Sequence, residues 1–98
     1  MLYYCQYTWF PGTTAQKVRE RFLQQHEAGA HHPDRWRGWY SLAGGGAGFL
    51  IVEVDDPREL TRMLQPYMDL VSWDVRAIYE LDYEQTVEQL RQLAQESS

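Results

Sequence analysis

The sequence has little cysteine and no long hydrophobic run. Cys5 is the single cysteine among 98 residues, which excludes an internal disulfide and a two-cysteine metal pair. An apolar run such as Phe49–Val52 is far shorter than the roughly 20 residues of a membrane-spanning helix. The first residues carry neither a basic segment nor an apolar signal region. We therefore expect a soluble, cytoplasmic protein without a membrane partner.

Basic residues are also scarce. Nine Lys and Arg residues against 14 Asp and Glu residues give a formal net charge of −5, the wrong sign for neutralising phosphates. Nucleic acid is therefore not an expected partner, and the arginines are spread along the chain rather than clustered. Hydrophobic residues at 44% supply one compact core, and the chain is too short for two. The prediction is a single domain over residues 1–98.

Turn and cap signals divide the first part of the chain into a strand, a helix and a loop. The aromatic segment Leu2–Trp9 predicts a strand that ends at a Pro-Gly turn. Thr13 to Gln16 has the Thr-x-x-Gln form of a capping box, and Gly29 is suited to end the helix that follows. Residues 30–37 show no periodicity and are expected to form a loop.

The middle of the chain predicts a hairpin and a second helix. Strands are expected at residues 38–42 and 48–54, joined by the glycine-rich turn at residues 43–46. Asp56 is a suitable N-cap, and Pro57 suits the first helical position. Pro66 should end or kink this helix, because proline has no N–H to bond four residues back.

The last part of the chain predicts a strand and a final helix. Apolar and polar residues alternate from Leu70 to about Leu81, which is the clearest strand signal in the sequence. Asp82 can cap a helix with one apolar stripe, formed by Tyr83, Val87, Leu90 and Ala94. Because such a stripe has no reason to exist on a solvated tail, we expect this helix to be docked on the domain, and its removal to destabilise the protein.

The element order predicts an α+β fold of the ferredoxin-like β-α-β-β-α-β type with an added C-terminal helix. The four strands of this fold form an antiparallel sheet in the order 4-1-3-2, and right-handed crossovers put both main helices on one face. The other face is left open. Its expected residues are Tyr4, Gln6, Trp39, Phe49, Ile51, Glu53, Asp74, Arg76 and Ile78. A slip of the first strand by one residue would instead place Tyr3, Cys5, Tyr7 and Trp9 there.

The open face predicts a partner. Aromatic and aliphatic side chains gathered on an uncovered sheet would form an exposed apolar patch, and such patches normally mark a contact surface or a ligand site. Pairing with a second copy about a two-fold axis covers the patch most simply. We therefore expect a homodimer that forms through this face.

The polar residues of the open face leave two interpretations. Gln6, Glu53, Asp74 and Arg76 could hold an anionic ligand or tune a carboxylate for acid–base work. They could also form a satisfied polar network that fixes the register of the dimer. Both interpretations predict that Arg76 lies in an enclosed cavity beside Glu53 or Asp74, because an unpaired buried guanidinium is costly.

Three other features have mainly structural interpretations. His31 and His32 are adjacent, point in different directions and lack the spacing of a metal site, although one of them could reach a cavity mouth and transfer a proton. The glycine tract lies between strands, so a hairpin turn is favoured over a phosphate cradle. Cys5 lies inside a strand and is expected in the core. No metal or cofactor is expected.

Two segments resemble a known family. They are Phe49-Leu50-Ile51-Val52-Glu53-Val54-Asp55-Asp56-Pro57 and Tyr67-Met68-Asp69-Leu70-Val71-Ser72-Trp73-Asp74. Together they resemble the small bacterial proteins labelled domain of unknown function 3303, within the dimeric α/β-barrel superfamily. The resemblance implies a homodimer whose two sheets enclose a barrel-like cavity, and it implies no particular activity.

The sequence therefore leaves two functions open. The first is a dimer that binds a small, partly apolar or anionic molecule in the barrel cavity, with cofactor-independent isomerase or oxygenase-like chemistry suggested by the superfamily. The second is a non-catalytic regulatory or protein-interaction dimer. A cavity of about 300 Å³ or more that is lined by the open-face residues favours the first function, and a filled interior favours the second. The sequence assigns no catalytic residue.

Overall fold

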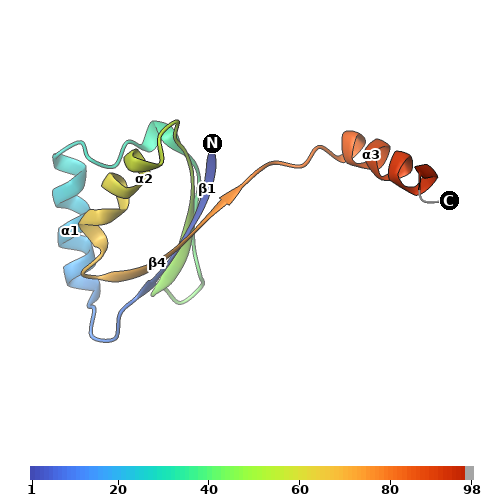
Figure 1. Ribbon diagram of the computed structural model, residues 1–98. Helices are drawn as coiled ribbons and strands as arrows, with labels where there is room; N and C mark the ends of the chain where they lie inside the picture. Colours follow the sequence, from blue (N-terminus) through green and yellow to red (C-terminus); the bar gives the residue numbers. More distant parts are fainter. Residues whose placement is uncertain (97–98) are drawn as a thin grey trace.

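The structure is a computed structural model that describes residues 1–96, and it has the expected alternation of strands and helices (Figure 1). The strands are β1 (Leu2–Trp9), β2 (Trp36–Ser41), β3 (Ala47–Glu53) and β4 (Val71–Ile78), and the helices are α1 (Ala15–Glu27), α2 (Pro57–Leu64) and α3 (Tyr83–Glu96). Short 3₁₀ helices η1 (Pro33–Arg35) and η2 (Gln65–Tyr67) precede β2 and follow α2. The fold is therefore α+β and ferredoxin-like.

The four strands form one antiparallel sheet in the order β2-β3-β1-β4, which confirms the predicted topology. Figure 1 shows α1 and α2 on the same side of this sheet. Cys5 lies opposite Leu50 and Val75, whereas Tyr4 lies opposite Ile51 and Arg76. Directly opposed residues share a face of a sheet, so Cys5 faces the helices and Tyr4 lies on the open face. This is the register that the alternation in β1 and β4 predicts.

Local cap chemistry positions the helices. Asp56 caps α2 by accepting a hydrogen bond from the N–H of Arg58 at 2.9 Å, and α2 ends at Leu64, before Pro66. At α1 the predicted capping box is wrong by one residue. Thr14 is the N-cap, while the hydroxyl of Thr13 donates to the carbonyl of Leu70 at 2.8 Å.

In residues 1–96 the helices fall short of the length and apolar character needed to span a bilayer.

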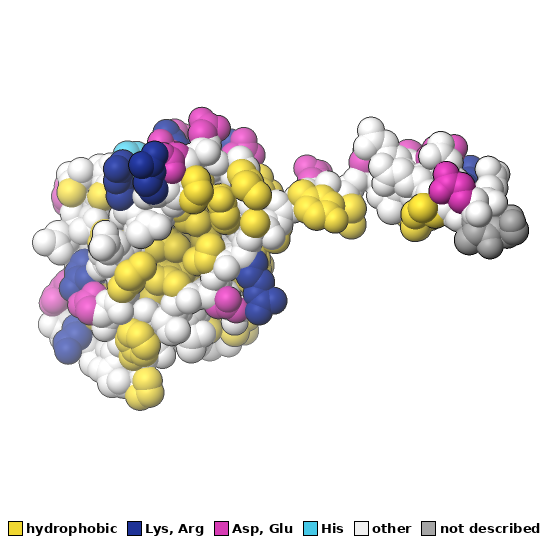
Figure 2. All heavy atoms as spheres, viewed as in Figure 1, with side chains coloured by type: hydrophobic (Ala, Val, Ile, Leu, Met, Phe, Trp, Pro, Cys, Tyr) yellow, Lys and Arg dark blue, Asp and Glu magenta, His cyan; other side chains and the backbone are white. Residues whose placement is uncertain are grey.

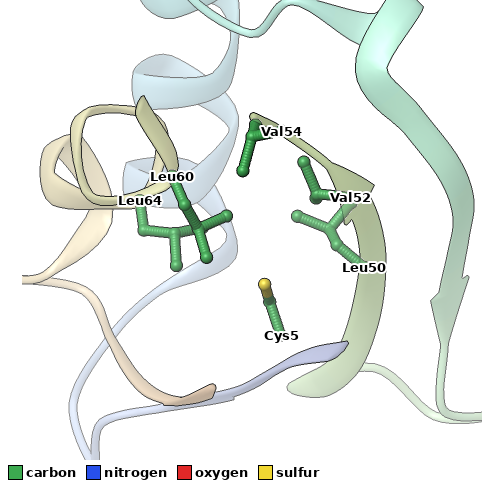
Figure 3. Close-up of a cluster of buried hydrophobic side chains, with 6 residues drawn as sticks. All are labelled: Cys5, Leu50, Val52, Val54, Leu60 and Leu64. Carbon is green, nitrogen blue, oxygen red and sulfur yellow. The ribbon is translucent and has the colours of Figure 1, made fainter. Parts of the chain in front are cut away.

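The hydrophobic core lies between α2 and the centre of the sheet (Figure 3). Its buried members are Cys5, Leu50, Val52, Val54, Leu60 and Leu64. Leu60 and Leu64 lie four residues apart on α2, so both project from one face of the helix onto β1 and β3. Burial raises the pKa of the Cys5 thiol to about 11, which keeps it protonated and unreactive. The expectation that Cys5 is a core residue is confirmed.

An irregularity in β2 reverses the predicted side of Trp39. Trp36 lies opposite Val52, but Gly38 lies opposite Ile51, so the register shifts by one residue between them. Because a bulge adds a residue to one strand, both Trp36 and Trp39 face the helices. Trp39 therefore does not lie on the open face, as strict alternation predicted, and Tyr40 takes that place opposite Phe49.

The final helix does not dock on the domain. Asp82 caps α3 by accepting from the N–H of Gln85 at 2.9 Å, as expected, but α3 buries no side chain. Figure 1 shows the helix held away from the sheet by the extended segment after β4, and Figure 2 shows the two parts as separate bodies of atoms joined by that segment. The prediction of a docked helix is therefore wrong for the single chain. An amphipathic stripe indicates that the apolar side of a helix is covered. It does not indicate whether the same chain or another chain covers it.

Candidate functional site

An apolar pocket lies between the helices and the sheet, on the face opposite to the predicted site. It has a volume of about 260 Å³. Side chains from the four strands, from both packed helices and from the loop after α1 line it. They are Tyr7, Trp9, Val18, Phe22, His31, Trp36, Trp39, Ser41, Leu50, Val52, Met63, Leu64, Tyr67, Val71 and Trp73. All four tryptophans of the chain are among them.

The pocket exists because α1 is held off the sheet by aromatic rings. α1 buries none of its side chains completely, in contrast to α2. The ring of Phe22 stacks on Trp39 with centroids 5.5 Å apart, and Trp39 meets Trp36 edge to face at 5.3 Å. Rigid rings in contact with each other cannot collapse into the space beside them as aliphatic chains can. The space between α1 and the sheet is therefore not filled by the described side chains.

Hydrogen bonds to backbone carbonyls fix two of the indoles. Trp36 donates from Nε1 to the carbonyl of His31 at 3.1 Å, and Trp73 donates from Nε1 to the carbonyl of Leu64 at 3.2 Å. Each bond joins a strand to the loop or helix that faces it across the pocket. Because a half-buried indole N–H is costly to leave unpaired, these bonds hold the rings in defined orientations.

His31 and Tyr67 form a polar pair in the pocket wall. The distance from the Nε2 atom of His31 to the hydroxyl oxygen of Tyr67 is 2.6 Å, and both side chains are half-buried. Burial lowers the pKa of His31, and the charge of His26 lowers it further. Burial raises the pKa of Tyr67 to about 12. At neutral pH the pair is therefore an uncharged imidazole bonded to an uncharged phenol.

Ion pairs fix the two segments that carry His31 and Tyr67. Arg35, just after the histidine loop, pairs with Glu59 on α2. Arg21 on α1 binds both carboxylate oxygens of Asp69, at 2.7 and 2.9 Å, and also donates to the carbonyl of Pro66 beside Tyr67. The bidentate pair holds the pKa of Asp69 below its ordinary value. The position of the polar pair is thus set from both sides of the pocket.

The buried histidine predicts a loss of stability on mild acidification. Since the pKa of His31 is lower in the folded protein than in the unfolded chain, the unfolded chain binds more protons as the pH falls through the unfolded value. We expect the free energy of unfolding to fall between pH 7.5 and pH 5.5. This range extends from about one pH unit above the ordinary histidine pKa to about one unit below it. We expect His31→Gln to reduce this fall, measured by urea denaturation at each pH.

The neighbouring histidine provides the control. His32 is exposed and has a left-handed backbone with φ of 53°, which asparagine tolerates well. His32→Asn should therefore keep the wild-type pH profile. A His31→Gln profile that matches wild type would contradict the assignment of the pH effect to His31.

The open sheet face holds eight of the nine predicted site residues. Cross-strand pairs place Tyr4, Gln6, Phe49, Ile51, Glu53, Asp74, Arg76 and Ile78 there, and Trp39 is the exception. Tyr4 packs against Phe49 with ring centroids 5.1 Å apart, and Phe49 stacks on Tyr40 at 5.0 Å. A row of three aromatic rings therefore crosses β1, β3 and β2 on this face.

The polar groups of the open face are not brought into one cluster in the single chain. Arg76 pairs with Asp74 at 3.3 Å, and both side chains are exposed. Glu53 lies 3.9 Å from Arg37 instead of beside Arg76. Arg76 thus has one of its two predicted partners. Its enclosure in a cavity would require a second chain over this face.

Sequence reasoning missed the helix-facing pocket because it treated that face as ordinary core. One signal was present: Tyr7 and Trp73 are large aromatic residues at predicted inward positions of a small domain. The other candidates remain structural. Gly44, Gly45 and Gly46 have φ values of 96°, 82° and 81° in the turn between β2 and β3. Within residues 1–96, no three His, Cys, Asp or Glu side chains are grouped to hold a metal ion.

Comparison with known proteins identifies the family. The model of the family described as Domain of unknown function (DUF3303) matches residues 1–94, so the chain belongs to this family. No curated protein matches the chain. Among solved structures, that of Rv0793 from Mycobacterium tuberculosis is similar, with 17% sequence identity and a TM-score of 0.46. The match covers 82% of this chain and 95% of that one.

Proposed function

We propose that this member of the DUF3303 family binds a small, largely apolar molecule in the pocket between α1, α2 and the sheet. The unfilled apolar pocket of about 260 Å³ carries the proposal. Dry apolar cavities of about 150 Å³ bind benzene, and sites for drug-sized ligands begin near 300 Å³. The pocket therefore fits a molecule of one or two rings. Its place differs from the predicted one, which was the space between two sheets.

The proposal includes a homodimer that forms through the open sheet face, in the arrangement of the dimeric α/β-barrel proteins. The row of Tyr4, Phe49 and Tyr40 rings and the neighbouring Ile51 support it, because Tyr40 is exposed and the other three side chains are only half-buried in the single chain. A two-fold axis would bring two such patches together. In this arrangement the helix-facing pocket of each subunit stays accessible.

Binding of ethylbenzene tests the proposed pocket. Because all four tryptophans line it, an apolar ring that enters should change the intrinsic tryptophan fluorescence in a saturable way. Val18 lies in the wall on α1, and Val18→Phe would fill part of the volume. We expect this variant to bind ethylbenzene at least about fivefold more weakly, since overfilling a packed space costs about 1 to 3 kcal/mol.

Leu23→Phe is the matched control. Leu23 lies on the same helix, is 52% exposed and is not part of the pocket wall. This variant should bind ethylbenzene as wild type does. A fluorescence signal that does not saturate, or one that Val18→Phe leaves unchanged, would contradict the proposed site.

One observation favours the second function, a protein-interaction dimer. The stripe of α3 includes Tyr83, which is 79% exposed, and Leu90, which is 59% exposed. A helix of 14 residues is only marginally stable alone in water, so a covering surface would stabilise it. Under this function wild-type protein would bind no ethylbenzene.

A further inference from the structure

The His31–Tyr67 pair is a polar group in the wall of a largely apolar pocket. We propose that this pair selects neutral aromatic ligands that carry a hydroxyl group, as a phenol does. The inference rests on the proposed function and adds the chemical class of the ligand. It is carried by the 2.6 Å contact between the two side chains and by their place in the pocket wall.

Three other polar side chains of the wall already have backbone partners. The indoles of Trp36 and Trp73 donate to the carbonyls of His31 and Leu64, and the Ser41 hydroxyl donates to the carbonyl of Leu42 at 3.1 Å. A ligand would have to break these bonds to use the donors. The Tyr67 hydroxyl, by contrast, keeps hydrogen-bonding capacity after it has bonded to His31, because a phenol offers one donor and two acceptor lone pairs.

A hydroxyl group matches this remaining capacity in either tautomer of His31. If Nε2 accepts from Tyr67, the Tyr67 oxygen is left to accept a hydrogen bond from the ligand. If Nε2 donates, the Tyr67 O–H is left to donate to the ligand. A ligand hydroxyl can meet both cases, whereas a carbonyl can meet only the second. The uncharged pair and its apolar surroundings disfavour a charged ligand group.

The rings around the pair favour a flat ligand. Phe22 lies 4.4 Å from the imidazole of His31, and Trp36 lies 5.8 Å from it, measured between ring centroids. Phe22 also stacks on Trp39 with 12° between the ring planes. A planar aromatic ring can stack or meet these rings edge to face without forcing them to reorient.

The expected preference is modest in size. His31 and Tyr67 already satisfy each other, so an apolar ligand leaves neither of them unpaired. A ligand hydroxyl therefore gains one net hydrogen bond and does not relieve a large penalty. Such a bond corresponds to a preference of about 5- to 10-fold for the hydroxylated ligand.

Ethylbenzene and 4-ethylphenol form a matched pair of probes. We expect wild-type protein to bind 4-ethylphenol about 5- to 10-fold more tightly than ethylbenzene. Tyr67→Phe removes the hydroxyl and keeps the ring, so it should abolish the preference while ethylbenzene still binds. Tyr79→Phe removes a hydroxyl from an 83% exposed side chain and should leave the preference unchanged.

Nitrogen NMR of wild-type protein gives a second readout that needs no folded variant. The Nε2 resonance of His31 should shift on addition of 4-ethylphenol and much less on addition of ethylbenzene. Equal affinities for the two probes in wild type, or a preference that survives in Tyr67→Phe, would overturn the inference and leave the pocket standing. Failure of both probes to bind would overturn the proposed function itself.

Discussion

Ile51→Glu is expected to convert the proposed homodimer into a monomer. Ile51 lies opposite Tyr4 and Gly38 at the centre of the open face, so pairing about a two-fold axis would bury it. In the dimer, a carboxylate at this position would lose its hydration without gaining a cationic partner. We expect dimer dissociation to become at least about 100-fold more favourable, measured by sedimentation velocity over a range of concentrations.

The control variant introduces glutamate on the helix-covered side of the domain instead. Leu23 is exposed on α1, and Leu23→Glu should sediment as wild type does. Thermal melts of both variants distinguish loss of the interface from loss of the fold. A wild-type chain that stays monomeric at micromolar concentration would show that the open face is not a self-association surface.

Gly48→Ala is expected to lower the free energy of unfolding by about 2 to 3 kcal/mol. A Cβ atom at this buried position would lie 2.5 Å from the hydroxyl oxygen of Tyr7 and 2.7 Å from its ring carbon, and closer still to the carbonyl of Tyr40. Real Cβ atoms do not approach so closely, so the Tyr7 ring and the β2 backbone would both have to move. Urea denaturation measures the loss, and displacement of Tyr7 should also weaken ethylbenzene binding.

A second glycine of the same hairpin provides the comparison. At Gly38 a Cβ atom would meet the Tyr40 ring at 3.0 Å, and Tyr40 is 57% exposed and able to turn away. Gly38→Ala should therefore cost well under 1 kcal/mol, in the range of ordinary surface changes. Equal losses for the two variants would show that the tight contact at Gly48 is not the cause.

The pocket and the open face use different aromatic residues of the chain. The tryptophans line the pocket, whereas Tyr4, Tyr40 and Phe49 form the row on the other side of the sheet. Since neighbouring strand residues point to opposite faces, a single four-stranded sheet can carry both surfaces. The two proposed properties can therefore be tested independently by substitutions on either face.

Local interactions made much of the fold predictable from the sequence. The Asp56 cap, the stop before Pro66, the glycine turn and the alternation in β4 depend on residues a few positions apart, and the structure confirms each of them. The topology followed from the order of these elements. The open-face residues of β1, β3 and β4 were correct for the same reason, because regular strands alternate strictly.

The pocket could not be predicted from the sequence, because it depends on contacts between distant elements. The shift in β2 moves Trp39 to the helix side, and it is visible only in the pairing with β3. His31 and Tyr67 are 36 residues apart, and their contact requires α1, η2 and the loop before β2 to be in place together. No spacing in the sequence carries this information.

The sequence by itself determined the elements, their order and which side chains of the regular strands share a face. Short-range propensity and periodicity decide these properties, and they act within a few residues. Tertiary structure alone decided the side of Trp39, the separation of α1 from the sheet and the detached position of α3. The first two properties depend on how large rings pack against each other, and the third depends on which surface covers an amphipathic helix. Neither the ring packing nor the covering surface is decided until distant segments of the chain meet.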